Sequence, residues 1–153
     1  MSTESGGSRR VHRFRVDATL PAMRDLGRIF GEFAGADPRL DPKSEALEEL
    51  RLVVREAATN IVEHGKVPSP EGGLGVELSC DGEELVVRLE SAGIPFDPRH
   101  APLEPPDPEE LAEGGYGIYL IRTLTDGIEY YTHEGGNVLV LRKRIGSSSR
   151  KAS

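Results

Sequence analysis

Apolar residues recur at helical spacing through residues 44–65, and this stretch dominates the hydrophobic pattern of the chain. One face of such a helix carries Leu47, Leu50, Val54, Ala57 and Ile61. Acidic residues occupy its first turns, where the positive end of the helix dipole stabilises them. Ser44 at the start and Gly65 at the end are residue types typical of helix boundaries. The pattern predicts one long amphipathic helix whose apolar face packs on the core.

The same helix carries a second, polar stripe. Because successive helical residues are rotated by about 100°, Glu56, Asn60 and His64 line up beside the apolar face. A carboxylate at the edge of a core can take a proton from a hydroxyl or water, and a carboxamide oxygen is a hard ligand suited to Mg²⁺ beside phosphates. Glu and Asn one turn apart also occur on many solvent-exposed helices, and His64 fits a dipole-stabilising role at the helix end. The spacing alone leaves both interpretations open.

The rest of the pattern divides into strands and shorter helices. Period-two alternation predicts strands over residues 11–16, 74–80, 84–90, 128–133 and 137–145. Helical spacing predicts further helices over residues 21–34, capped by Asp17 or Thr19, and over residues 118–124. Asp81-Gly82 predicts a hairpin turn. This order predicts an α+β fold, a two-layer sandwich of a mostly antiparallel mixed sheet with helices on one face.

Composition limits the class of protein. The 153 residues suffice for one domain with a core, which we expect over residues 10–145, with disordered segments at 1–9 and 146–153. The net charge of −7 disfavours direct nucleic-acid binding, and no apolar run is long enough to cross a bilayer. The single cysteine, Cys80, cannot form a disulfide within the chain. These features predict a cytoplasmic protein without a membrane or nucleic-acid partner.

Glycines precede the helix predicted over residues 118–124. Gly114, Gly115 and Gly117 leave backbone N–H groups open at a helix start, which is an arrangement that can bind the phosphates of a nucleotide. A flexible hinge before a helix would have the same composition, so both interpretations stand. Gly93, after the end of a predicted strand, is a second position where backbone can approach a flat ligand closely.

Four motifs taken together are more specific than any one of them. They are EAATNIVEH at residues 56–64, GIPFDP at 93–98, GGYGIYLIRTLTDGIEY at 114–130 and GGNVLVL at 135–141. In order and spacing the chain resembles the GHKL, or Bergerat, ATP-binding fold shared by gyrase, histidine kinases and the anti-sigma-factor serine kinases. The resemblance covers residues 10–144 and is strongest to the small, stand-alone anti-sigma regulatory domains.

The resemblance implies binding of ATP and Mg²⁺, with roles carried over position by position. Glu56 would be the general base for transfer of the γ-phosphoryl group to a serine or threonine, and Asn60 would be the Mg²⁺ ligand. Residues 98–113, which are rich in proline and acidic residues, would form a lid over ATP. The other ATP-binding positions that the resemblance implies are Ser91, Gly93, Gly114, Gly115 and Gly117.

The resemblance also implies partners. Proteins of this branch bind a sigma factor or phosphorylate a STAS-domain antagonist, often as homodimers, so that partner switching couples phosphorylation to transcription. The first hypothesis is therefore an anti-sigma-type regulator with serine/threonine protein kinase activity. The second is a non-catalytic protein-binding module of the same fold, with weak or absent ATP binding.

Departures from the family pattern favour the second hypothesis. Ser91 stands where relatives carry an aspartate that accepts a hydrogen bond from adenine, and a neutral acceptor is weaker than a carboxylate. Glu113 stands where kinase members carry a basic residue facing the γ-phosphate, and we expect Arg99 or Arg122 to replace that cation. Val140 is the residue expected at the position of a threonine in the last strand.

Overall fold

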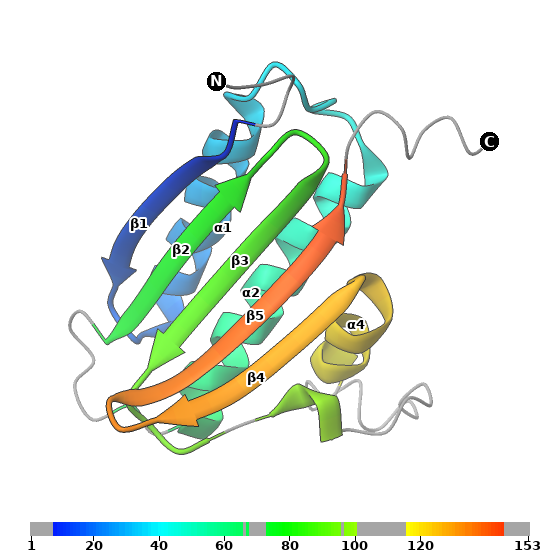
Figure 1. The fold of residues 1–153 in the computed structure, drawn as a ribbon. Helices are drawn as coiled ribbons and strands as arrows, with labels where there is room; N and C mark the ends of the chain where they lie inside the picture. The colour runs from blue at the N-terminus through cyan, green and yellow to red at the C-terminus, as the bar shows by residue number, and fades with distance from the viewer. Residues whose placement is uncertain (1–7, 66, 68–72, 96, 101–115, 146–153) are drawn as a thin grey trace.

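A single antiparallel sheet and one layer of helices make up the fold. The computed structural model describes residues 8–65, 67, 73–95, 97–100 and 116–145, and all structural statements below concern these residues. In chain order the elements are β1 (Arg10–Val16), α1 (Leu20–Gly35), α2 (Glu45–Gly65), β2 (Leu74–Cys80), β3 (Glu84–Ser91), the 3-10 turn η1 (Pro98–His100), α4 (Tyr116–Leu124), β4 (Gly127–His133) and β5 (Gly136–Arg144). The strand order is β1-β2-β3-β5-β4, and each described pair is antiparallel. The predicted α+β sandwich is confirmed (Figure 1).

Helix α2 is the middle element of the helical layer. It contacts α1 on one side and α4 on the other, and it also contacts β3 and β5. Figure 1 shows it running behind the centre of the sheet, with all three helices on the same face. The five apolar residues of its predicted core-facing stripe are all buried. The alternation in the strands supplies the other half of the core, since Leu78, Val87 and Leu141 lie in one row across three strands and are fully buried.

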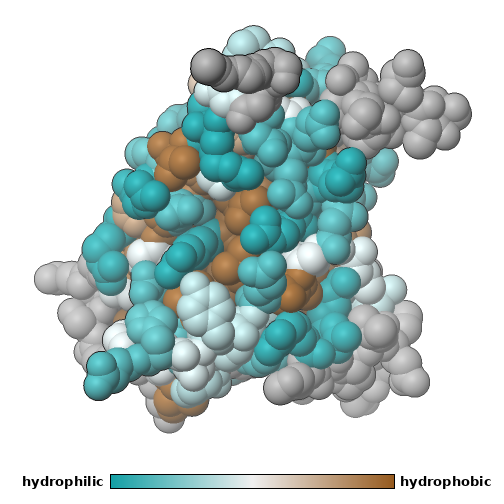
Figure 2. Space-filling view, viewed as in Figure 1, coloured by the Kyte–Doolittle hydropathy of each residue, from teal (hydrophilic) through white to brown (hydrophobic). Residues whose placement is uncertain are grey.

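The face of the sheet that points away from the helices is only partly polar. Val86, Val138 and Val140 form a small apolar cluster there, separate from the main core. Charged side chains share this face, among them Arg88, which lies opposite Val140, and Glu77, which lies opposite Arg88. Figure 2 views the molecule from this side and shows apolar patches between hydrophilic ones.

Caps and turns agree with the local sequence. Of the two predicted caps for α1, the structure selects Thr19, whose hydroxyl accepts a hydrogen bond from the Ala22 N–H. Ser44 caps α2 in the same way by accepting from the Leu47 N–H. At the β2–β3 hairpin, the Asp81 carboxylate accepts from the N–H groups of Glu83 and Glu84, and Gly82 adopts a positive φ of 95°.

A buried carboxylate fixes the connection between α1 and α2. The side chain of Asp37 is fully buried and accepts a two-pronged hydrogen bond from the Arg39 guanidinium, at 2.9 and 2.8 Å. Arg10 of β1 lies 3.0 Å from the same carboxylate. Arg39 also donates to the carbonyl of Cys80 at the end of β2. The hydrogen bond from Arg39 is the main cause that holds the pKa of Asp37 far below its usual range, against the opposing effect of burial.

Replacing this carboxylate tests the role of the cluster. We expect Asp37→Asn to lower the free energy of unfolding by about 2–3 kcal/mol at pH 7, because two arginines lose their charged acceptor. The depressed pKa means that the stabilisation is fully present above the usual carboxyl pKa of about 3.9 and is lost as the pH falls below it. Urea denaturation from pH 7 to pH 3 should therefore show a difference between the two proteins that shrinks with acid. Asp25→Asn, at an exposed position of α1, is the matched control and should differ little from wild type at any pH. A constant difference across the range would contradict this account.

Candidate functional site

The carboxylate of Glu56 lies against the first turn of α4. Glu56 is half-buried on α2, and a Cβ atom placed on Gly117 would lie 3.3 Å from its carboxyl carbon and closer still to Oε1. Among the described residues, Glu56 makes no hydrogen bond or ion pair. A carboxylate that is partly withdrawn from water and unpaired remains free to accept a proton from a bound hydroxyl. The structure thus brings together two of the residues that the sequence singled out, Glu56 and Gly117.

Asn60 follows one helical turn later, and its side chain is only 7% exposed. Within the described part of the chain, its amide nitrogen has no hydrogen-bond partner. Leaving a buried polar group unsatisfied costs about 1–3 kcal/mol, so such groups in native proteins commonly face a ligand, ion or water. The unpartnered N–H group is a donor that suits a phosphate oxygen, and the oxygen of the same amide is a type of ligand that Mg²⁺ accepts beside phosphates. No cluster of three or more His, Cys, Asp or Glu side chains suited to a metal occurs in the described residues.

The turn after β3 packs directly on the end of α2. A Cβ on Gly93 would overlap the carbonyl oxygen of Gly65, and it would lie 3.2 Å from the Val67 nitrogen. The Ile94 N–H donates a hydrogen bond to the same Gly65 carbonyl. Only glycine permits this approach of the two backbones. The structure therefore shows a close backbone approach at Gly93, and the element approached is the end of α2.

Ser91 ends β3 on the side of the sheet that faces the helices, and it is buried. Its partner across the ladder is Asn137, the second residue of β5. Asn137 is also buried, and its side-chain amide donates a hydrogen bond of 2.7 Å to the carbonyl of Gly93. Sequence reasoning missed Asn137, because only the strand register shows that it lies opposite the end of β3.

Val140 does not face this site, so the expectation that it replaces a threonine of the nucleotide site is wrong. Val140 pairs with Arg88 and packs with Val86 and Val138 on the face of the sheet that points away from the helices. Side chains alternate along a strand, so Val140 and Asn137 lie on opposite faces. Asn137 is the residue of β5 that faces the Gly93 turn.

Helix α2 sets the spacing between the two halves of the site. Glu56 lies at one level beside Gly117, whereas Gly65 lies nine residues further along, against Gly93. At 1.5 Å per residue these two levels are about 14 Å apart along the helix axis, with Asn60 between them. An elongated ligand with an anionic end beside Asn60 and Glu56 and a flat end at the Gly93 turn would match this arrangement.

Some predicted site residues lie outside the described residues, namely Gly114, Gly115, Glu113 and most of the segment 98–113. Of the two candidate cations, Arg99 is exposed and held by Asp97 at 2.8 Å, and it also donates to the carbonyl of Tyr130. The charge of Arg99 is therefore paired within the segment that follows β3. Arg122 lies in the last turn of α4.

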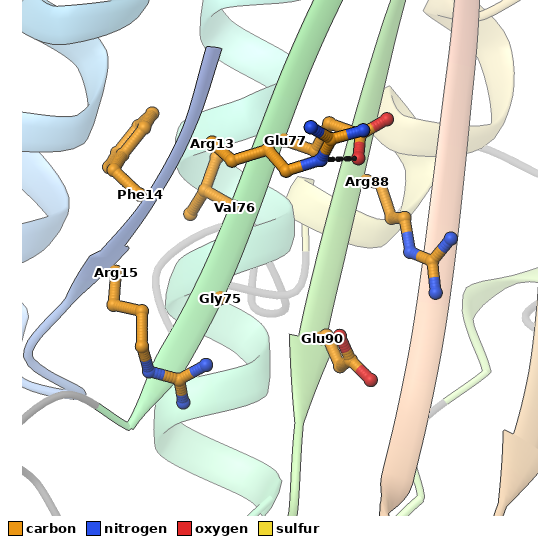
Figure 3. A pocket seen from close by; sticks show the side chains of 8 residues that line it. All are labelled: Arg13, Phe14, Arg15, Gly75, Val76, Glu77, Arg88 and Glu90. Atoms are coloured by element: carbon orange, nitrogen blue, oxygen red, sulfur yellow. Dashed lines mark hydrogen bonds and ion pairs between the residues drawn. The ribbon is translucent and has the colours of Figure 1, made fainter. Parts of the chain in front are cut away.

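A hollow of about 600 Å³ lies on the face of the sheet that points away from the helices. Figure 3 shows its lining, with Arg13 bonded to Glu77 and with Arg15 and Arg88 reaching across the strands. Gly75 lies between Arg15 and Glu90 in the sheet, and a Cβ there would lie 3.0 Å from the Arg15 guanidinium. Because the sheet separates this hollow from α2, it is not part of the site formed by Glu56 and Asn60.

Known proteins resemble this chain over most of its length. A family model described as the histidine kinase-like ATPase domain matches residues 16–143. The serine-protein kinase RsbW of Listeria monocytogenes is 34% identical, over 84% of this chain and 86% of that protein. The serine-protein kinase RsbW of Bacillus subtilis is 28% identical, over 83% and 84%.

Solved structures agree in fold. The RsbU and RsbW domains of Rv1364c from Mycobacterium tuberculosis match with a TM-score of 0.62 at 15% identity, over 89% of this chain and 32% of that chain. The SiaB–SiaC complex from Pseudomonas aeruginosa matches with a TM-score of 0.52 at 15% identity, over 88% and 89%. In the described part of this chain, no helix combines the length and apolar character needed to span a membrane.

The contact between Gly65 and Gly93 gives a direct test of the site's construction. We expect Gly93→Ala to lower the free energy of unfolding by about 2 kcal/mol or more, because the new methyl group meets backbone that cannot move aside. Gly35→Ala is the matched control, since a Cβ there meets nothing within 4 Å. Chemical denaturation of both variants measures the difference. Equal stability of Gly93→Ala and wild type would show that the turn does not rest on α2.

Proposed function

This chain belongs to the histidine kinase-like ATPase domain family, and from that membership we propose that it binds ATP with Mg²⁺ and phosphorylates a serine or threonine of a partner protein. One observation carries the proposal. The unpaired carboxylate of Glu56 contacts Gly117 in the first turn of α4, and the unsatisfied amide nitrogen of Asn60 lies one turn further along α2. Polar groups without partners at the edge of a core are typical of ligand-binding sites.

Each residue has a role in the proposed transfer. Glu56 takes the proton of the attacking hydroxyl, while the new O–P bond forms at the γ-phosphorus and the bond to the β-phosphate oxygen breaks. Asn60 offers its amide oxygen as a ligand for Mg²⁺, which would neutralise charge on the phosphates when bound. The absence of a side chain at Gly117 lets α4 approach the Glu56 carboxylate, and we propose that the backbone N–H groups of Gly114, Gly115 and Gly117 bind the phosphates. Ser91 and Gly93 would contact the base, at the turn that packs on α2.

The proposed partners follow from the relatives. Several relatives carry the name serine-protein kinase, and the SiaB–SiaC structure is a complex of two proteins. We propose that this chain is an anti-sigma-type regulator that binds a sigma factor, a STAS-domain antagonist or both. Its place would be the cytoplasm, where such switching regulates transcription.

We also propose that the chain forms a homodimer through the face of the sheet that points away from the helices, which we call the open face. The chain carries a net charge of −7, which opposes the approach of two copies. On the open face, however, arginines and glutamates alternate and balance, as in the pairs of Arg13 with Glu77 and Arg142 with Glu129. The apolar cluster of Val86, Val138 and Val140 lies among them.

A second candidate function is a non-catalytic module that holds a partner protein with weak or absent ATP binding. The observation that favours it is Ser91, a buried neutral side chain at the end of β3 where a carboxylate would bind an amino group more strongly. The two functions differ in whether phosphate reaches a protein acceptor.

Substitution of the proposed base separates binding from transfer. We expect Glu56→Gln to lower phosphoryl transfer to a serine-containing acceptor by at least about 100-fold. Millimolar ATP with Mg²⁺ should still raise the free energy of unfolding of this variant as it does for wild type, since a ligand of the native state stabilises it. Glu63→Gln, an exposed position of the same helix, is the control and should transfer phosphate normally. Absence of nucleotide stabilisation in wild type would end the kinase proposal, and full activity of Glu56→Gln would refute the role of Glu56.

Replacing Asn60 tests the metal ligand with a measurement that needs no catalysis. We expect Asn60→Leu to be as stable as wild type without ligand or up to about 1 kcal/mol more stable, because a buried unsatisfied amide is replaced by an apolar group of similar size. In wild type, Mg²⁺ should increase the affinity for ATP. In the variant, this increase should be at least about tenfold smaller. Denaturation and calorimetry with and without Mg²⁺ measure the two effects. An unchanged dependence on Mg²⁺ would remove Asn60 from the metal site.

A further inference from the structure

Asn137 makes a contact between segments far apart in the chain. Its side-chain amide nitrogen donates a hydrogen bond of 2.7 Å to the carbonyl oxygen of Gly93, which is 44 residues away. Asn137 is 8% exposed, so water has little access to this bond. The backbone of Asn137 pairs with Ser91 in the β3–β5 ladder, which places the side chain just beyond the end of β3.

The peptide group between Gly93 and Ile94 is held at both of its polar atoms. Its carbonyl oxygen accepts from Asn137 of β5. Its N–H donates to the carbonyl oxygen of Gly65 at the end of α2. One peptide plane is therefore fixed between the sheet and the helix that carries Glu56 and Asn60.

The hairpin on the sheet side is built for this contact. Gly136 has a positive φ of 148°, and a Cβ there would lie 3.3 Å from the Ala92 Cα and would overlap the carbonyl oxygen of Ser91. The absence of a side chain lets the start of β5 lie directly on the turn. Gly93 itself has no side chain to restrict its backbone, so its peptide would be free to rotate without the two hydrogen bonds.

We infer that Asn137 is a positioning residue for the base side of the nucleotide site. It fixes the orientation of the Gly93–Ile94 peptide, and through it the surface that the turn presents to a flat ligand beside Ser91. Asn137 does not act on the phosphates in this proposal, because the contact of Glu56 with Gly117 lies about 14 Å along α2 from the contact of Gly65 with Gly93. This inference rests on the proposed function and adds a determinant of base binding to it.

The test compares a ligand that has a base with one that lacks it. The two probes are ATP and inorganic tripolyphosphate, each with Mg²⁺, and calorimetry measures their affinities. Asn137→Asp keeps the shape of the side chain but cannot donate to the Gly93 carbonyl when ionised. Asn137→Val keeps a residue that favours strands and also lacks the donor. Ser79→Ala is the control, because Ser79 is a buried polar residue of the same sheet that bonds to Arg9 instead.

We expect both Asn137 variants to bind ATP about tenfold more weakly and to bind tripolyphosphate as wild type does. Hydrogen exchange of the Ile94 amide, measured by NMR without ligand, should become at least about tenfold faster, while the amides at the centre of β3 keep their protection. Ser79→Ala should change neither the ratio of the two affinities nor the exchange at Ile94.

The outcomes separate the inference from the proposed function. Equal losses of affinity for ATP and tripolyphosphate would mean a general effect on the fold and would overturn the role of Asn137. So would unchanged ATP affinity and unchanged Ile94 exchange in the folded variants. If wild type binds no ATP, the proposed function and the base-side role fall together, whereas ATP binding that is insensitive to Asn137 overturns this inference alone.

Discussion

The backbone contact between Gly65 and Gly93 is the constraint on which the site depends. It joins the end of α2 to the turn that leaves the sheet, and it does so without an intervening side chain. Once that end is fixed, the straight helix determines where Asn60 and Glu56 lie, because each residue advances the chain by a fixed rise. Packing of α2 against α4 then brings Gly117 to the level of Glu56. Two glycine contacts, one at each level, thus mark the two ends of the proposed site along α2.

Two buried charged groups of the described residues show how this protein pairs its buried polar side chains. Asp37 is enclosed by two arginines. Lys143, on β5, is 8% exposed and lies 2.9 Å from Glu49 of α2 while it also donates to the carbonyl of Leu124. Burial of charge is costly unless such partners are present. Among the described residues, the carboxylate of Glu56 and the amide nitrogen of Asn60 have no such partners. This difference supports a ligand site at α2.

Local sequence patterns predicted the parts of the structure that depend on local physics. The long helix, its polar stripe and the Asp81-Gly82 hairpin follow from periodicity and turn chemistry, and the structure confirms them. Asn137 could not be found in this way, because its role depends on the register between β3 and β5. Val140 was misassigned for the same reason, since a shift of three positions along a strand moves a side chain to the other face. The closeness of Gly65 and Gly93 is likewise a long-range contact that no local pattern contains.

The most direct test of the account is an NMR titration of the protein with ATP and Mg²⁺. If α2 carries the nucleotide site, the largest shifts should occur at the side-chain amide of Asn60 and the backbone amides of Gly117 and Gly93. The hollow on the open face of the sheet, around Arg13, Gly75 and Arg88, should change little. Shifts concentrated in that hollow, with Asn60 and Gly117 unmoved, would contradict the account.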